Sequence, residues 1–417
     1  MMKSSFLNEA VARGFVYQFT NLEAIDEYLS TKGRCGYVGF DITAKSLHVG
    51  HLIPIFTMRL FQKHGHKPII LVGGGTTKVG DPSFRNTTRP MLSNEQIAEN
   101  LKGIKSCLEP FLKFENGSGS DDNSAIMLNN AAWLDNINYL EFLRDIGKYF
   151  SINRMIGFDS VKTKLSQNNS LSFLEFNYMI LQAYDFYRLF TDRNCRIQLG
   201  GQDQWGNIVC GVELIRKKCE AEVFGLTNPL LTTSDGKKMG KTANGAVWLS
   251  ENFLSAYDFW QYWRNVADAD VIKLMYLFTD LPIDEIKKME SVRGEEMNAL
   301  KVILADEITS IVHGKNSLES IHQSAKGIFN QSCEDLAKID SVSRYPTEKS
   351  ESIIDILVKT QLCSSRGDAK RMIRGKGVYV NNQSITEDYK LPQDLSDGDL
   401  LKLSCGKKKT VILEIKD

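Results

Sequence analysis

Two histidines stand three positions apart in a short loop between a predicted strand and a predicted helix. His48 and His51 flank Gly50 in the run His-Val-Gly-His. Side chains three apart share one face of a helix, and a glycine between them lets a flat base approach the backbone. Two neutral imidazoles here could donate hydrogen bonds to phosphate oxygens as charge builds up in a transition state. A two-histidine metal site or a structural pair also fits the spacing, although no nearby Cys or acidic pair is spaced to supply a third metal ligand.

A second group of cations lies in a glycine-containing segment, residues 234–242. It contains Lys238 and Lys241, followed by Thr242. Ammonium groups on a flexible loop suit phosphate binding. Taken alone, such a run is more often a solvated lysine loop.

Three polar residues repeat along one predicted helix. Tyr178, Gln182 and Asp185 fall at positions i, i+4 and i+7 of an otherwise apolar run. Buried polar groups need hydrogen-bond partners, and a polar ligand, water or neighbouring side chains could supply them. Asp81 follows another predicted strand, where it could cap a turn or pair with a substrate ammonium. The sequence leaves both alternatives open.

The elements around these residues predict a parallel sheet. Residues 35–40 and 67–73 are typical of buried strands, and a helix from residue 52 separates them, which indicates a parallel crossover. Residues 196–199 form a further strand that runs into a glycine-containing turn. The polar loops would therefore meet at the carboxyl edge of one sheet, where open α/β sheets bind nucleotides.

Length and composition are those of an ordinary multidomain globular protein. The chain has 417 residues, 42% hydrophobic and 24% charged, which predicts two or three domains. No apolar run reaches the roughly 18 residues that cross a bilayer, and the N-terminus does not resemble a secretory signal. The eight cysteines are scattered, which favours free thiols in a reducing cytosol. Basic and acidic residues number 51 each, so net charge gives no argument for a polyanionic partner.

The predicted fold class is α/β, with three domains. A Rossmann-like parallel-sheet catalytic domain spans 1–245 and carries a helical insertion at about 130–172. An all-helical domain spans 246–325, a linker spans 326–350, and a small α+β domain spans 351–417. In the last, four basic side chains lie on one helix, which favours contact with RNA phosphates over a merely solvated face: Arg366, Lys370, Arg371 and Arg374.

These motifs resemble those of bacterial-type tyrosyl-tRNA synthetases, which are class I aminoacyl-tRNA synthetases. The run His48–His51 is similar to the first class signature, and Lys238–Thr242 is similar to the second, a lysine loop that closes on ATP. The resemblance runs the full length and includes an RNA-binding module similar to that of a ribosomal protein. Two departures stand out: Ile42 replaces a proline common in the family, and Gly240 and Thr242 replace two serines of the wider signature.

The resemblance implies a role for each site residue. Tyr37 and Asp185 would hold the phenol hydroxyl of tyrosine. Its ammonium would bind to Asp81, Tyr178 and Gln182, and its carboxylate would lie near Gln204. The ATP phosphates and ribose would be lined by Gly39, Asp41, Thr43, Gly50, Gly200 and Asp203. The triphosphate would be met by His48, His51, Lys238, Lys241 and Thr242, with Arg85 and Arg89 further out.

The resemblance also implies the reaction and the partners. Tyrosine would be activated with ATP to tyrosyl-adenylate and then transferred to the 3′-terminal ribose of its tRNA. Mg²⁺ would arrive with ATP, held by phosphates and water rather than by a protein cage. A cytoplasmic homodimer that uses the 130–172 insertion as its interface is expected, with no membrane association. A tryptophanyl enzyme, or an RNA-binding protein derived from a synthetase, are the alternatives.

Overall fold

The computed structural model describes residues 2–81, 92–115, 123–166, 171–242, 245–330, 344–387, 389–406 and 409–416. The chain forms two compact units. The first comprises Met1–Ser255 with Phe259–Gly314, and the second comprises Ala256–Asp258 with Lys315–Asp417.

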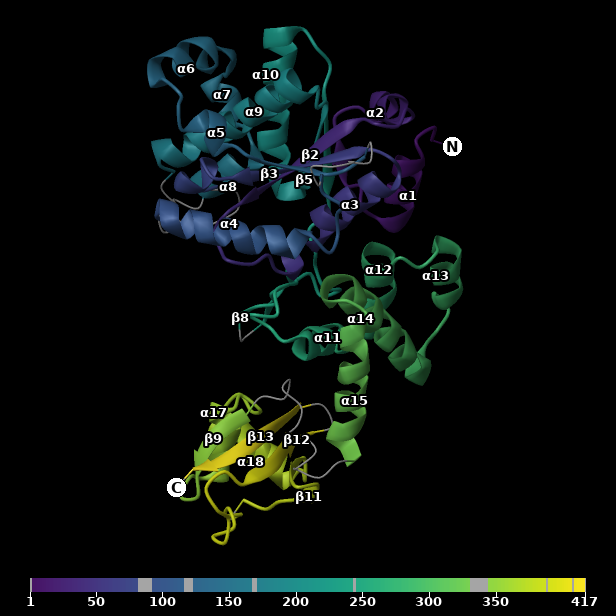
Figure 1. Ribbon diagram of the computed structural model, residues 1–417, viewed down its shortest axis with the longest axis vertical. Helices are drawn as coiled ribbons and strands as arrows, with labels where there is room; N and C mark the ends of the chain where they lie inside the picture. The colour runs from purple at the N-terminus through teal and green to yellow at the C-terminus, as the bar shows by residue number, and fades with distance from the viewer. Residues whose placement is uncertain are drawn as a thin grey trace. The chain divides into compact units, whose positions relative to one another are not determined.

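A six-stranded sheet forms the centre of the first unit (Figure 1). Its strand order is β1-β6-β5-β2-β3-β4, with β1 antiparallel to β6 and the other five strands parallel. The parallel strands are short apolar runs, as expected for strands buried on both faces. Their bounds are β1 (Gln18–Phe19), β2 (Cys35–Asp41), β3 (Lys67–Gly73), β4 (Ile126–Asn129), β5 (Ile197–Gly201) and β6 (Phe224–Asn228).

Helices connect these strands. The predicted crossover is present: β2 leads through η1 (Val49–His51) and α3 (Leu52–Lys63) into β3. Ser93 and Gln96 form a capping box that satisfies backbone N–H groups at the start of α4. The remaining elements before β4 are α1 (Ser5–Arg13), α2 (Leu22–Leu29), η2 (Thr76–Lys78) and α4 (Asn94–Leu108).

Short helices fill the region predicted as an insertion. These short helices and the two long helices that follow share one apolar core. Its buried residues include Phe142, Met155 and Ala183. A second capping box, Ser172 with Glu175, begins the longest helix. The elements are α5 (Ala131–Leu134), α6 (Tyr139–Asp145), η3 (Gly147–Tyr149), α7 (Ile152–Ile156), α8 (Asp159–Ser166), α9 (Phe173–Arg193), η4 (Gln202–Gln204) and α10 (Trp205–Cys219).

The rest of the first unit is a two-stranded ribbon and a helical region. Trp260 and Trp263 are buried there, with Trp263 packed against Phe259 and Phe278, whereas Phe253 is 46% exposed. The elements are β7 (Lys241–Thr242), β8 (Gly245–Ala246), α11 (Ala256–Arg264), α12 (Asp268–Phe278), α13 (Ile283–Met289), η5 (Gly294–Glu296) and α14 (Met297–His313).

The second unit contains a five-stranded sheet with its own apolar core. Its strand order is β11-β10-β12-β13-β9, and β9 pairs in parallel with β13. Its elements are α15 (Asn316–Asn330), β9 (Arg344–Glu348), α17 (Ile353–Lys359), α18 (Arg366–Arg374), β10 (Val378–Val380), β11 (Gln383–Ser384), β12 (Leu400–Cys405) and β13 (Lys409–Lys416).

The predicted fold class is confirmed: a parallel-sheet domain, a helical region and a C-terminal sheet domain follow one another along the chain. The segment predicted as a linker, 326–350, overlaps the end of α15 and all of β9, and 331–343 lie outside the described residues. The C-terminal sheet therefore includes a strand before residue 351. None of the helices in the described ranges is long and apolar enough to cross a membrane.

Candidate active site

A cavity of about 700 Å³ lies at the carboxyl ends of the parallel strands. The ends of β2, β3 and β5 and the residues that follow β4 and β6 all contribute to its wall. It brings together fourteen of the residues predicted from the sequence: Gly39, Asp41, Thr43, His48, Gly50, His51, Asp81, Tyr178, Gln182, Asp185, Gly200, Asp203, Gln204 and Lys238.

The two histidines are held by backbone N–H groups. The N–H of Gly50 donates to His48 Nδ1 at 3.0 Å, and the N–H of His48 donates to His51 Nδ1 at 3.2 Å. The ring centroids are 4.0 Å apart. A nitrogen that accepts a hydrogen bond carries no proton, so each neutral ring holds its proton on Nε2. Both imidazoles are therefore set as Nε2 donors.

The histidine loop and the lysine loop lie in direct contact. The N–H of Val49 donates to Val247 O at 2.9 Å, and the N–H of Val247 donates to Gly240 O at 3.0 Å. A Cβ added to Gly240 would lie 2.8 Å from the Gly50 nitrogen, and one added to Gly50 would lie 2.7 Å from His48 Cε1. Glycine at position 240 is therefore a condition for the close approach of the two loops, and glycine at position 50 leaves room for the His48 ring.

The predicted phosphate-binding cations are only partly described. Lys238 is exposed and lines the cavity. Lys241 and Thr242 form β7, whose backbone pairs with β8, but their side chains lie outside the described part. Arg85 and Arg89 also lie outside the described residues.

Asp185 and Tyr37 are both buried, and of the two only Asp185 lines the cavity. Asp185 is 2% exposed and accepts hydrogen bonds from Trp133 Nε1 at 2.7 Å and Asn130 Nδ2 at 2.9 Å. Tyr37 is 1% exposed, and its hydroxyl makes no hydrogen bond among the described residues. A buried hydroxyl without a partner is costly, and a polar ligand beside it would remove that cost.

Burial is the main cause of the pKa shifts of Asp185 and Tyr37. Desolvation raises the pKa of Asp185 to about 7, although the hydrogen bonds from Asn130 and Trp133 oppose the rise. Desolvation, and next the nearby Asp185 carboxylate, raise the pKa of Tyr37 well above its usual value. Tyr37 therefore stays a neutral hydroxyl, while Asp185 changes charge near neutral pH.

A chain of hydrogen bonds runs from Asp185 to the nucleotide side of the cavity. Asn130 Nδ2 also donates to Thr76 Oγ1 at 3.1 Å, and Thr76 Oγ1 donates to Asp41 Oδ1 at 3.1 Å. Tyr178 Oη donates to the same Asp41 oxygen at 3.1 Å. The orientations of Asp185 and Asp41 are thus coupled through neutral side chains.

A second chain follows the β5–α10 turn. Gln204 Nε2 donates to Asp81 Oδ2 at 2.8 Å. Asn207 Nδ2 donates to Gln204 Oε1 at 3.1 Å and to Gln182 Oε1 at 3.0 Å. Desolvation, and next the charge of Asp81, raise the pKa of Asp203. Predicted ligands of the substrate ammonium, Asp81 and Gln182, therefore share one network.

Four polar residues of these networks were not predicted from the sequence: Thr76, Asn130, Trp133 and Asn207. Asn130 directly follows β4, a short strand that was not predicted from the sequence. A polar residue at the end of a parallel strand would have been a usable signal, had that strand been recognised. Trp133 gives no such signal, because its role depends on a contact with a residue 52 positions away.

Comparison with known proteins identifies the family. The family described as tRNA synthetases class I (W and Y) matches residues 34–330, and the tyrosine–tRNA ligase SYY-like C-terminal domain matches residues 332–413. The chain is 47% identical to the tyrosine–tRNA ligase of Paracoccus denitrificans, over 99% of each chain. The chain belongs to the tyrosine–tRNA ligase family.

Solved structures of tyrosyl-tRNA synthetases have the same fold. The C-terminally truncated mitochondrial enzyme of Aspergillus nidulans is 28% identical with a TM-score of 0.69, covering 78% of this chain and 94% of its own. The corresponding Coccidioides posadasii enzyme is 31% identical with a TM-score of 0.66, covering 76% and 91%. The resemblance inferred from the two signatures is confirmed, and the tryptophan alternative is not favoured, because these relatives are tyrosine enzymes.

Proposed function

We propose that this member of the tyrosine–tRNA ligase family activates L-tyrosine with ATP and transfers it to the 3′-terminal ribose of its tRNA. The observation that carries the tyrosine assignment is the buried Tyr37 and Asp185 pair. Both residues are buried, and Asp185 lines the same cavity as His48 and His51, so the pair can offer a hydroxyl and a carboxylate to a phenol hydroxyl.

In the first step an oxygen of the tyrosine carboxylate attacks the α-phosphorus of ATP. A new O–P bond forms, and the bond to the β-phosphate oxygen breaks, so that pyrophosphate leaves with its electron pair. The Nε2–H groups of His48 and His51, together with Lys238, donate to phosphate oxygens as negative charge accumulates. No side chain forms a covalent intermediate, so the rate gain comes from positioning and electrostatics.

The ammonium of tyrosine binds to Asp81, Tyr178 and Gln182, and Gln204 lies beside its carboxylate. The Asn207 hydrogen bonds hold Gln204 and Gln182 in place before substrate arrives. Mg²⁺ enters as a complex with ATP, carried by phosphate oxygens and water. The described residues contain no group of three or more His, Cys, Asp or Glu able to hold a metal ion by themselves.

Phenylalanine would leave the buried Tyr37 hydroxyl and Asp185 without a partner. Such a penalty excludes the analogue by roughly 10⁴–10⁵, a magnitude taken from tyrosine-specific synthetases as a class. The deciding assay is ATP–pyrophosphate exchange with tyrosine, phenylalanine and tryptophan in parallel. Tyrosine-dependent exchange that Asp185→Ala makes less selective against phenylalanine supports the assignment. Exchange dependent on tryptophan, or unchanged selectivity in Asp185→Ala, contradicts it.

In the second step a ribose hydroxyl of tRNA attacks the tyrosyl carbonyl and AMP leaves. We assign tRNA contacts to the helical region α11–α14 and to the basic side chains of α18. The three arginines of α18 form exposed ion pairs within the domain: Arg366 with Asp355, Arg371 with Asp368, and Arg374 with Glu387. Exposed pairs of this kind are weak, so phosphates can replace the carboxylates at little cost. Charging takes place in the cytoplasm, where ribosomes consume the product.

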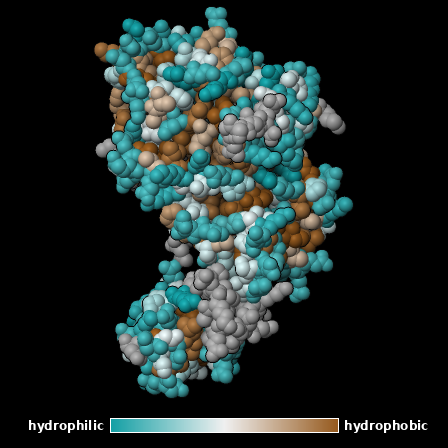
Figure 2. All heavy atoms as spheres, in the orientation of Figure 1, coloured by the Kyte–Doolittle hydropathy of each residue, from teal (hydrophilic) through white to brown (hydrophobic). Residues whose placement is uncertain are grey.

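A homodimer is supported by exposed apolar side chains in the predicted 130–172 interface and at the residue that follows it. Leu140 is 74% exposed, Phe173 69% and Ile152 64%. Brown surface at the upper left of Figure 2 lies where Figure 1 places α6 and α7. Clustered exposed apolar residues are typical of protein–protein contacts. Leu140→Glu should shift the protein from dimer to monomer in sedimentation equilibrium, and a wild-type monomer would refute this interface.

A further inference from the structure

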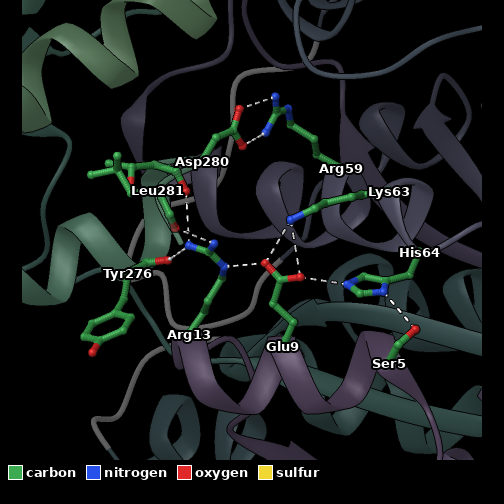
Figure 3. A network of polar contacts seen from close by, with 10 residues as sticks. Ser5, Glu9, Arg13, Arg59, Lys63, His64, Tyr276, Asp280 and Leu281 are labelled. Carbon is green, nitrogen blue, oxygen red and sulfur yellow. Dashed lines mark hydrogen bonds and ion pairs between the residues drawn. The ribbon is translucent and has the colours of Figure 1, made fainter. Parts of the chain in front are cut away.

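Arg13 lies in the last turn of α1, and its guanidinium donates hydrogen bonds to backbone carbonyls at the end of α12. It is 6% exposed. Its Nη1 donates to Tyr276 O at 3.0 Å and Thr279 O at 3.1 Å, and its Nη2 donates to Leu281 O at 2.9 Å (Figure 3). The last carbonyls of a helix lack intrahelical partners, and a cation there is stabilised by the helix dipole.

Glu9, one turn earlier on α1, connects Arg13 to α3. It accepts from Arg13 Nε at 2.8 Å, from Lys63 Nζ at 3.1 Å and from His64 Nε2 at 2.8 Å. The hydrogen bond from His64, and those from Arg13 and Lys63, hold the pKa of Glu9 well below its usual range. Lys63 and His64 lie at the carboxyl end of α3. We call Glu9 and Arg13 the α1 clamp, because they join α3 to α12.

A second polar contact joins the same two helices directly. Arg59 of α3 forms a bidentate ion pair with Asp280, two residues after the end of α12. A cavity of about 590 Å³ interrupts the packing here, with Arg13, Arg59 and Asp280 in its wall. Deeper in, Phe56 and Phe278 pack with ring centroids 5.2 Å apart. The apolar contact thus keeps the helices together, while the polar contacts limit how they can pivot.

α3 also begins at the histidine loop, so one helix connects His48 and His51 to the clamp. α12 belongs to the helical region to which we assign tRNA contacts. A tRNA bound there reaches the adenylate only if the helical region is held at a fixed angle to α3. Adenylate formation involves small molecules within the cavity and has no such requirement.

We propose that Arg13 is a positioning residue for tRNA charging: through the α1 clamp it sets the helical region relative to the catalytic sheet. The inference rests on the proposed function, and it adds a residue outside the active-site cavity. Arg13→Met keeps the apolar stem but removes every donor to the three carbonyls. Arg13→Lys keeps one cation at the helix end and should restore part of the effect.

Both half-reactions are to be measured on purified full-length protein. In Arg13→Met, tyrosine-dependent ATP–pyrophosphate exchange should stay within about twofold of wild type, while kcat/KM for tRNA falls by roughly tenfold or more. Arg59→Met, at a partly exposed position, should also lower kcat/KM for tRNA more than pyrophosphate exchange, but by a smaller factor. Arg196→Met is the matched control, because Arg196 also donates to a backbone carbonyl, that of Glu222, and lies over the ring of Phe190, both within the catalytic domain and outside the helical region.

Equal losses in both half-reactions, or a loss of tRNA charging without a loss of pyrophosphate exchange in Arg196→Met, would overturn the inference. A wild-type protein without tyrosine-dependent exchange would instead contradict the proposed function. Hydrogen–deuterium exchange tests the clamp whether or not the protein is active. Arg13→Met should speed exchange at residues 276–285 and at the end of α3 while leaving β2 and β5 unchanged. Unchanged exchange at both clamp segments would also refute the proposal.

Discussion

At the scale of single residues, burial decides the chemistry of the site. Asp185 and Tyr37 are both almost completely buried, so solvent stabilises the charged form of neither side chain. Asp185 stays partly ionised near pH 7 only because Trp133 and Asn130 donate hydrogen bonds to it. In the proposed site these two donors would therefore tune the affinity for the phenol hydroxyl without belonging to the predicted substrate contacts.

Trp133→Phe should weaken tyrosine binding in a pH-dependent way. The change removes the Nε1 donor and keeps most of the ring, so the pKa of Asp185 rises further and less of it is ionised at pH 7. The KM for tyrosine in pyrophosphate exchange should rise by roughly tenfold at pH 7, about the value of one hydrogen bond to a charged group. The defect should narrow towards pH 8.5, because Asp185 then ionises in both proteins. A defect independent of pH would show that Trp133 acts by packing alone.

His66 provides a test of burial away from the site. It is 1% exposed and stacks on Phe61, and desolvation lowers its pKa from 6.5 to about 4. Its contribution to stability is fully present above pH 6.5 and is lost progressively as the pH falls from 6.5 to about 4, because only the unfolded chain binds the proton in that window. Wild type should lose about 2 kcal/mol more than His66→Phe in free energy of unfolding between pH 7 and pH 5. Urea titrations at both pH values measure this, and parallel losses would contradict the assignment.

At the scale of elements, the site depends on two loops that meet at glycines. The backbone of the lysine loop lies against the start of η1, and the strand pairing around Val247 holds it there. The contact links two segments almost two hundred residues apart in the sequence. A side chain at this contact would separate the imidazole donors from the lysines.

Gly240→Ala should slow adenylate formation much more than it weakens tyrosine binding. The new Cβ would lie 2.8 Å from the Gly50 nitrogen, at a backbone φ of +95°. Gly236→Ala is the matched control, since Gly236 has a φ of +81° in the same loop but nothing within 4 Å of an added Cβ. The expected loss in the single-turnover rate is roughly a hundredfold for Gly240→Ala and under about threefold for Gly236→Ala. Similar losses in both would assign the effect to backbone strain.

At the scale of the whole molecule, the C-terminal sheet domain has a hydrophobic core of its own, distinct from that of the catalytic domain. Among the described residues, seventeen buried side chains form that core, all of them after residue 352. The parallel pairing of β9 with β13 means that a cut at residue 351 would leave a strand of this sheet behind. A cut after Asn330 removes the sheet whole.

Truncation after Asn330 should spare adenylate formation and impair tRNA charging. Pyrophosphate exchange should stay within about twofold of the full-length protein, while kcat/KM for tRNA should fall by at least roughly tenfold as phosphate contacts are lost. The charging of the full-length protein should fall with rising salt more steeply than that of the truncated protein. Equal losses of exchange and charging would show that the domain is needed for folding.

Elements whose signal lies within a few neighbouring residues of the sequence were predicted correctly. The strands that became β2, β3 and β5 are apolar runs that end in glycine or polar turns, and the polar face of α9 follows from helical spacing alone. Ends of parallel strands meet at one sheet edge, so the shared location of His48, Asp81 and Asp203 followed from topology. The short strand β4 was missed, because four half-buried residues show no alternation strong enough to separate a strand from a loop.

The amino-acid sequence by itself determined the family, the fold class and the residues around the cavity, because signatures, periodicity and turn residues are local properties of the chain. Only the tertiary structure decided what those residues do to one another. It placed Asn130 and Trp133 on Asp185, Gly240 against Gly50, and Arg13 at the end of α12. Hydrogen bonds and desolvation act over a few ångströms in space, and no spacing along the chain records which distant segments come that close.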